Sequence, residues 1–202
     1  MRKIYQDAWL GISFPEFTAL DAEKIADIHF YERFYQELFR RYATYEELPA
    51  DWRKGKVALA DFILDSTDPK DRLLAIGCGN GYMEVLLSQT HRQVTAIDPS
   101  PGATRLLAHY PAVKLINGSF PECLQSDGQP PYDVAYLNAV DYCLAEDELA
   151  ALLKQIYDYP IKTFILISVS VYHKYDLGRC VKDYLKEILK FFKVYHPGQF
   201  WG

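Results

Sequence analysis

This sequence has little that suits a metal centre or a disulfide framework. Only four cysteines occur among its 202 residues, and no two of them form a CxxC pair. None of them lies beside a histidine at the spacing of a zinc site. We therefore expect free, reduced thiols and no metal ion. The four cysteines are Cys78, Cys123, Cys143 and Cys180.

Long apolar runs are missing as well. No stretch approaches the roughly 18 apolar residues of a membrane-spanning helix, and the N-terminal sequence MRKIYQDAWL lacks the apolar core of a signal peptide. We expect a cytoplasmic protein with no membrane partner.

The sequence has no excess of positive charge. Its formal net charge is −5, and acidic residues are interleaved with the lysines of its densest basic region, Arg179 to Lys193. Such alternation is typical of a solvated helix face, whereas nucleic-acid-binding proteins more often carry an unbalanced basic patch. We expect no nucleic-acid partner, and a length and hydrophobic content typical of one globular core.

Two parts of the chain differ in pattern. Residues 1–70 are interpreted as a helical and irregular segment, with helices over Asp21–Tyr42 and Asp51–Leu64. From residue 71 to residue 202, short apolar runs alternate with helical spacing, which predicts a mostly parallel β-sheet with helices on both faces. The expected strands are RLLAIG, VTAID, VKLING, YDVAYLN and TFILISVS, and the expected helices are Tyr82–Ser88, Thr104–His109, Glu146–Tyr157 and Leu177–Phe192.

A glycine-rich loop follows the first of these runs. Gly77, Gly79 and Gly81 alternate with other residues where a strand leads into a helix, so a ligand can approach the backbone closely. We expect the start of the helix to offer unpaired N–H groups to an anionic group. Asp98 ends the next apolar run, where its carboxylate can accept hydrogen bonds from a ribose.

The spacing of the loop disfavours two common nucleotide cofactors. A dinucleotide loop needs G-x-G-x-x-G, but Tyr82 occupies the third glycine position. The lysine of a triphosphate-binding loop is also missing.

AIGCGNG followed by VTAIDPS resembles the first two motifs of the class I S-adenosylmethionine-dependent methyltransferases, over about half of the chain. The resemblance implies a Rossmann-like fold, S-adenosyl-L-methionine as cofactor and a small-molecule methyl acceptor. It places the glycines beside the methionine part of the cofactor and Asp98 at its ribose. The cofactor-binding residues so implied are Gly77, Cys78, Gly79, Gly81, Asp98, Pro99, Ser119, Phe120 and Asn138.

Later residues are candidates for the adenine and acceptor sites. In the family the loop after the third strand lines the adenine, and here it is Gly118-Ser119-Phe120, although Phe120 equally suits the core. Asn138 ends the fourth run, and Asp141 and Tyr142 are candidates for binding the acceptor. For Asp141, a helix cap or a solvated loop acid is the alternative. His173, after the fifth strand, is a candidate general base or a structural histidine.

The N-terminal segment is predicted to cover the cofactor as a helical lid. Tyr31 and Tyr35 lie four residues apart, so they share a helix face and are candidates for binding the acceptor, unless they serve only packing. The C-terminal strand hairpin of the family is apparently missing, and the exposed sheet edge makes a homodimer possible. Ala75 stands where the family usually has an acid, so an inactive or regulatory S-adenosylmethionine-binding scaffold is the alternative function.

Overall fold

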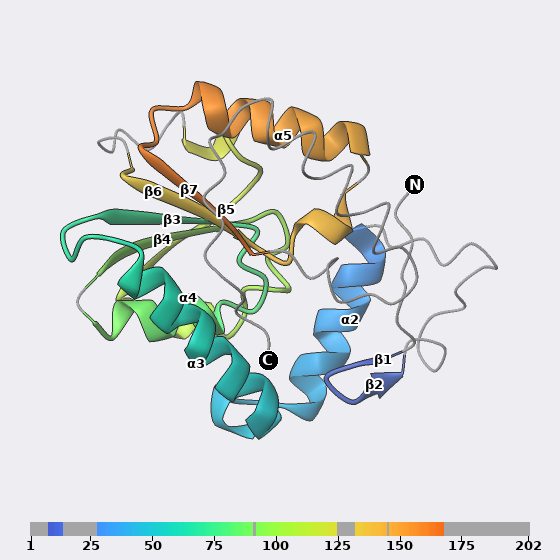
Figure 1. The fold of residues 1–202 in the computed structure, drawn as a ribbon. Helices are drawn as coiled ribbons and strands as arrows, with labels where there is room; N and C mark the ends of the chain where they lie inside the picture. The colour runs from blue at the N-terminus through green and yellow to red at the C-terminus, as the bar shows by residue number, and fades with distance from the viewer. Residues whose placement is uncertain (1–7, 14–27, 91, 125–131, 145, 168–202) are drawn as a thin grey trace, which may run out of the picture.

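The computed structural model describes residues 8–13, 28–90, 92–124, 132–144 and 146–167. Its centre is a five-stranded sheet in which every strand pairs in parallel with its neighbour, in the order β5-β4-β3-β6-β7 (Figure 1). The strands are β3 (Arg72–Ile76), β4 (Gln93–Asp98), β5 (Val113–Asn117), β6 (Val134–Asn138) and β7 (Thr163–Ile167).

The order of the strands fixes where a ligand can bind. The chain runs outward from the central strand β3 through β4 to β5, and then crosses to β6 on the other side of β3. In open sheets of this kind, ligands bind beyond the carboxyl ends of the strands, at the point where the direction changes. That point lies between β3 and β6, and the predicted Rossmann-like fold is confirmed.

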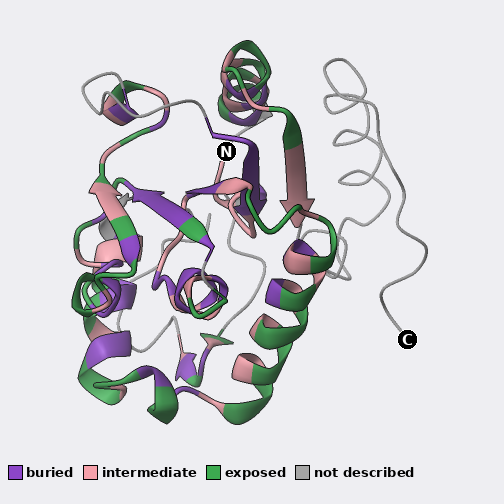
Figure 2. Ribbon diagram, turned by 90° about the vertical axis from the view of Figure 1, so that its left-hand side faces the viewer, coloured by how far each residue is buried: buried purple, intermediate pink, exposed green. Residues whose placement is uncertain are grey.

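Helices cover both faces of the sheet. In Figure 1, α5 (Glu146–Asp158) lies on one side, and α3 (Ala50–Asp65) and α4 (Tyr82–Ser88) lie on the other. Leu73 and Ala75 of β3 belong to the hydrophobic cluster that includes α3 and α4, whereas Leu74 and Ile76 belong to the cluster that includes α5. Because alternate side chains point to opposite faces, the strand is buried on both (Figure 2).

The N-terminal segment shares this core. Helix α2 (Ile28–Arg41) contributes Phe34 and Leu38, both fully buried, to the same cluster as Leu73 and Ala75. The described residues on the two sides of residue 70 therefore pack around one core. None of the helices in the described parts of the chain is both long and apolar enough to cross a membrane.

A two-stranded hairpin before α2 was not predicted. Its strands are β1 (Ala8–Trp9) and β2 (Ile12–Ser13), and its turn residues Leu10 and Gly11 have φ angles of 50° and 72°. Turns of this type favour asparagine or aspartate before glycine, so Leu10 gives no signal in the sequence. Trp9 stacks on Phe34 of α2 with ring centroids 4.8 Å apart, so packing on the helix holds the hairpin in place.

The expected helix over Thr104–His109 is wrong in extent. The structure has a turn there, followed by the single 3-10 turn η2 (Leu107–His109). The N–H of Ala108 donates to the carbonyl of Thr104, four residues back, but those of His109 and Tyr110 donate to carbonyls only three residues back, so the chain tightens into a 3-10 turn. The helix expected over Leu177–Phe192 lies outside the described residues, as does the end of the fifth strand beyond Ile167. The expectation that a C-terminal hairpin is missing also concerns residues outside the described part.

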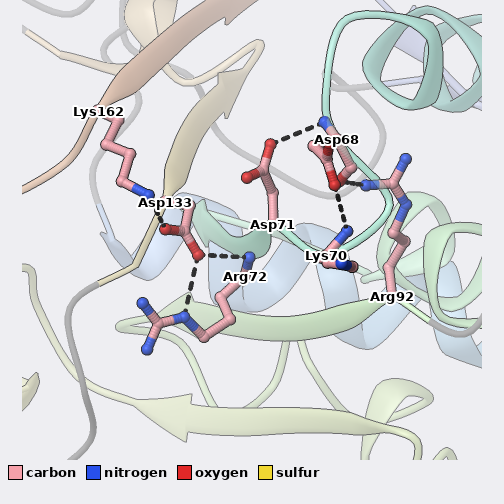
Figure 3. A network of polar contacts seen from close by, with 7 residues as sticks. All are labelled: Asp68, Lys70, Asp71, Arg72, Arg92, Asp133 and Lys162. Carbon is pink, nitrogen blue, oxygen red and sulfur yellow. Dashed lines mark hydrogen bonds and ion pairs between the residues drawn. The ribbon is translucent and has the colours of Figure 1, made fainter.

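A polar network fixes the amino ends of the central strands (Figure 3). The Asp133 carboxylate accepts hydrogen bonds from the backbone N–H and Nε of Arg72, each at 3.0 Å, and from Nζ of Lys162 at 2.7 Å. These cations hold the pKa of Asp133 well below its ordinary value. The contacts join the starts of β3, β6 and β7 at the edge opposite the ligand crevice.

Arg92 binds carbonyl groups at and just after the end of α3 in the same region. Its guanidinium donates to the carbonyl oxygens of Leu64 at 3.3 Å and Thr67 at 3.2 Å. It also donates to the carbonyl oxygen of Asp68 (Figure 3). The last carbonyls of a helix lack partners within it, so a buried guanidinium can satisfy several at once. Arg92 thereby ties α3 to the start of β4.

Candidate cofactor and methyl-transfer site

The glycine-rich loop lies at the crevice between β3 and β6, as the sequence predicts. Gly77 follows β3 directly, and Gly81 is the residue before α4. The N–H groups of Gly77 and Cys78 donate to the carbonyl of Ile97, at 2.8 Å and 3.1 Å, so the loop is fastened to the end of β4.

Each of the three glycines is required by the backbone. Gly77, Gly79 and Gly81 have φ angles of 72°, 58° and 74°, which L side chains rarely adopt. A Cβ atom at Gly77 would lie 2.6 Å from Cγ2 of Val140, and one at Gly81 would lie 2.6 Å from Leu107. The glycines are therefore required both by the backbone angles of the loop and by the side chains that pack against it.

Asp98 lies beside this loop, at the end of β4. One carboxylate oxygen accepts the N–H of Gly79 at 2.8 Å, and the other accepts the N–H of Ser100 at 2.9 Å. The side chain is buried, and burial raises the pKa of Asp98 to about 6 despite these two donors. A carboxylate has about four lone-pair sites, so capacity to accept hydrogen bonds from a ribose is left.

The expectation of unpaired amides at the start of α4 is wrong for the loop itself. The N–H of Gly79 donates to Asp98, that of Gly81 to the Cys78 carbonyl, and that of Tyr82 to the side chain of Asn80. Two of these acceptors lie within the turn, and the third, Asp98, is brought to it by the end of β4. These three amides are therefore not open donors.

Helix α2 contacts the glycine-rich loop and the segment that follows β6. The Tyr35 hydroxyl lies only 2.5 Å from where a Cβ of Gly79 would be, and the Tyr31 hydroxyl donates to Sγ of Cys143 at 3.0 Å. Cys143 belongs to η4 (Asp141–Cys143), which follows β6. The two tyrosines therefore contact the loops that follow β3 and β6, the two strands that flank the switch point.

The other predicted site residues fall into different surroundings. Phe120 is buried beneath α5, with its ring 5.3 Å from that of Tyr159, so it takes the core role. Ser119 is exposed and Asn138 is half-buried, and both lie at the carboxyl ends of strands.

Three further predictions concern the rim and the acceptor side. Pro99 is exposed beside Asp98. Asp141 is buried, which excludes the alternative of a solvated loop acid. The backbone of Tyr142 lies in η4, and its side chain is outside the described part, as is the whole of His173.

Sequence reasoning missed a buried polar pair below the loop. Glu84, in the first turn of α4, and Tyr136, in the middle of β6, are almost fully buried, and the Tyr136 hydroxyl donates to Oε1 of Glu84 at 2.9 Å. Burial raises the pKa of Glu84 to about 7 and raises that of Tyr136 well above its ordinary value. The signal in the sequence was a glutamate within the otherwise apolar helix YMEVLLS.

A second buried tyrosine is hydrogen-bonded to the same loop. The buried Tyr45 hydroxyl donates to the carbonyl of Asn80 at 2.5 Å, and its ring lies 5.2 Å from that of Tyr82. Among the described residues, no group of three or more His, Cys, Asp and Glu side chains is placed to hold a metal ion.

Comparisons with known proteins agree with this geometry. A family model described as a methyltransferase domain matches residues 28–175, and none of the curated proteins matches. The PH0226 protein of Pyrococcus horikoshii is similar in fold, with a TM-score of 0.51 and 18% identity over 76% of this chain and 68% of that one.

Two further solved structures are similar at a lower level. The TehB-like SAM-dependent methyltransferase of Corynebacterium glutamicum has a TM-score of 0.47 and 19% identity, over 66% of this chain and 68% of that one. The CcbJ methyltransferase of Streptomyces caelestis has a TM-score of 0.46 and 22% identity, over 60% of this chain. The match spans about half of the CcbJ chain, at 53%.

Proposed function

The chain belongs to the class I S-adenosylmethionine-dependent methyltransferase family, and we propose that it transfers the methyl group of S-adenosylmethionine to an oxygen or nitrogen atom of a small molecule. The observation that carries the proposal is the loop of three left-handed glycines whose central member donates its N–H to the buried Asp98.

The residues fit this cofactor. We assign the loop Gly77 to Gly81 to the methionine part and Asp98, which is hydrogen-bonded to that loop, to the ribose hydroxyls. Ser119, just after β5, and Asn138, at the carboxyl end of β6, are assigned to the rest of the cofactor. A carboxylate that already orders the loop is held in place before the cofactor arrives, which reduces the cost of binding.

The bound cofactor supplies a methyl group on a sulfonium, which is an excellent leaving group. The protein has to orient an acceptor lone pair in line with that methyl carbon, and positioning of this kind can supply several kcal/mol. An acceptor that starts as a hydroxyl or protonated amine must also lose a proton. We assign Tyr31, Tyr35, Asp141 and Tyr142 to the acceptor side and His173 to proton removal.

Two features favour a small acceptor. Helix α2 places Tyr35 on the glycine loop and Tyr31 on η4, so the lid closes over the space where methyl transfer would occur. The net charge of −5 does not suit a polyanionic acceptor.

One observation favours a second candidate, a scaffold that binds the cofactor without turnover. Ala75 is fully buried among apolar side chains, so β3 offers no carboxylate to the crevice. Such a scaffold would bind S-adenosylmethionine and S-adenosylhomocysteine but would methylate nothing.

The test uses S-adenosylmethionine with a deuterated methyl group and a panel of small hydroxyl and amine acceptors. We expect mass spectrometry to show S-adenosylhomocysteine together with one deuterated product, and expect Asp98→Ala to lose this activity while Asp133→Asn keeps it. Binding of the cofactor without its conversion across the panel would favour the scaffold. Failure to bind either compound would refute both candidates.

A further inference from the structure

Glu84 is a carboxylate placed where a purely structural core would have an apolar side chain. It lies three residues after Gly81 and is 2% exposed, in a helix whose neighbouring residues Met83 and Val85 pack into the core. A buried carboxylate is costly unless it is paired or hydrogen-bonded. Tyr136, whose hydroxyl donates to the Glu84 carboxylate, is 1% exposed and lies in β6, next to the central strand.

The position of this pair ties it to the cofactor loop. Tyr136 is the register partner of Ala75 in β3, two residues before Gly77. The Glu84 carboxylate interacts electrostatically with Cys78 in the loop and with Asp98 at the end of β4. The pair therefore lies directly beneath the loop that we assign to the methionine part of the cofactor.

Other titratable groups face Glu84 from the elements packed around it. Lys56 reaches it from α3, with Nζ 5.4 Å from the centroid of the Trp52 ring, and Tyr45 faces it from η1 (Tyr45–Glu47). Burial lowers the pKa of Lys56 to about 8 and raises that of Glu84 to about 7, while Tyr136 and Lys56 favour the ionised carboxylate. Glu84 therefore changes its charge near neutral pH, and a nearby cation would favour its ionised form.

We propose that Glu84, held by Tyr136, is a positioning residue whose buried negative charge makes the site prefer the sulfonium of S-adenosylmethionine to the uncharged thioether of S-adenosylhomocysteine. The inference rests on the proposed function, since it needs that cofactor in the crevice. Glu84 acts through space across the loop, because neither it nor Tyr136 is exposed to the ligand. Transfer of the methyl group removes the positive charge from sulfur, so the same carboxylate ceases to attract the product and favours its release.

The readout is the ratio of two dissociation constants, measured by calorimetry at pH 8 for S-adenosylmethionine and S-adenosylhomocysteine. A full charge acting over roughly 10 Å at an effective dielectric constant of about 20 changes an affinity by about tenfold. We expect Glu84→Gln to weaken S-adenosylmethionine binding by about tenfold and to leave S-adenosylhomocysteine within about twofold. The matched control is Asp133→Asn, which removes a carboxylate at the opposite edge of the sheet and should keep the wild-type ratio.

A second variant keeps the inference testable if Glu84→Gln fails to fold. Tyr136→Phe leaves the ring in the core and removes only the donor to Glu84, so the pKa of Glu84 should rise further. In the wild type, the preference for the sulfonium should increase as the pH rises through about 7. In Tyr136→Phe the preference for the sulfonium should increase at a higher pH than in the wild type. In Glu84→Gln this increase near pH 7 should be absent. Asp98 and Lys56 are unchanged in both variants, so the difference between the variants reports on Glu84.

The outcomes separate this inference from the proposed function. If the wild type binds both compounds but Glu84→Gln weakens both equally or neither, or if Tyr136→Phe keeps the wild-type pH profile, the inference is overturned and the function stands. If the wild type binds neither compound, the proposed function fails and the inference fails with it.

Discussion

Gly79→Ala tests whether α2 closes on the cofactor loop. Gly79 has a φ angle of 58°, and a Cβ there would lie 2.5 Å from the Tyr35 hydroxyl oxygen and 3.6 Å from the ring carbon that carries it. The substitution therefore introduces backbone strain and a clash with one atom of a side chain from α2. Tyr35→Phe removes that atom and leaves the backbone strain unchanged.

The backbone strain acts both in the wild type and in Tyr35→Phe, whereas the clash acts only in the wild type. An alanine in the left-handed region costs about 1–2 kcal/mol, and overpacking of a buried contact costs about 1–3 kcal/mol. Tyr35 is buried between the rings of Phe34 and Phe39, with centroids 5.3 Å and 6.0 Å away, so it can yield only in part. We expect Gly79→Ala to lower the free energy of unfolding by about 2–4 kcal/mol in the wild type and by about 1–2 kcal/mol in Tyr35→Phe.

The assay is a double-mutant cycle of urea unfolding, in which the effect of Tyr35→Phe itself cancels. The matched control is Gly55→Ala in α3, where a Cβ would meet nothing within 4 Å. That substitution should stabilise the protein by about 0.5–1 kcal/mol, because alanine is the better helix former, and the gain should be the same in both backgrounds. If Gly79→Ala also costs the same with and without the Tyr35 hydroxyl, α2 does not rest on the loop in solution and the lid assignment is refuted.

Three further predictions concern the ribose site, the choice of cofactor and the opposite edge of the sheet. Asp98→Ala should weaken S-adenosylhomocysteine binding by about 1–3 kcal/mol, because the ribose loses a charged acceptor; unchanged affinity in calorimetry would contradict the ribose assignment. NADH should not bind, because Tyr82 stands where a dinucleotide loop needs glycine; a saturable fluorescence enhancement that NAD competes away would refute this. Asp133→Asn should lower the free energy of unfolding by about 1–2 kcal/mol at pH 7, a modest effect because Lys162 is exposed. Because the pKa of Asp133 is lowered in the folded protein, its stabilisation is present above about pH 4 and is lost as the pH falls below that; a difference that stays constant down to pH 2.5 would argue against the network.

The sheet could be predicted because its strands carry strong local signals. Each is a short apolar run, the inner strands β3, β4 and β6 are buried along most of their length, and β3 is followed by glycines that the backbone requires. The acid at the end of β4 could be placed beside the loop because neighbouring parallel strands end at the same edge. The bounds of α4, Tyr82–Ser88, were also predicted correctly, because the last glycine of the loop marks where the helix begins.

The features that were missed depend on contacts between distant residues. The hairpin at Leu10 is held by packing on Phe34 and not by a turn sequence. The pair of Glu84 and Tyr136 depends on which strand lies beside β3, and strand order cannot be read from a local pattern. The pairing of the loop amides likewise depends on the folded structure. Asp98 accepts the N–H of Gly79, and the side chain of Asn80 accepts that of Tyr82.

A crystal structure with S-adenosylhomocysteine would test the central claim most directly. The account predicts electron density along Gly77 to Gly81, with both ribose hydroxyls within hydrogen-bond distance of the Asp98 carboxylate and the homocysteine part beneath Tyr35. Density for the ligand at another place, or an empty crevice at saturating concentrations of a ligand that calorimetry shows to bind, would contradict it.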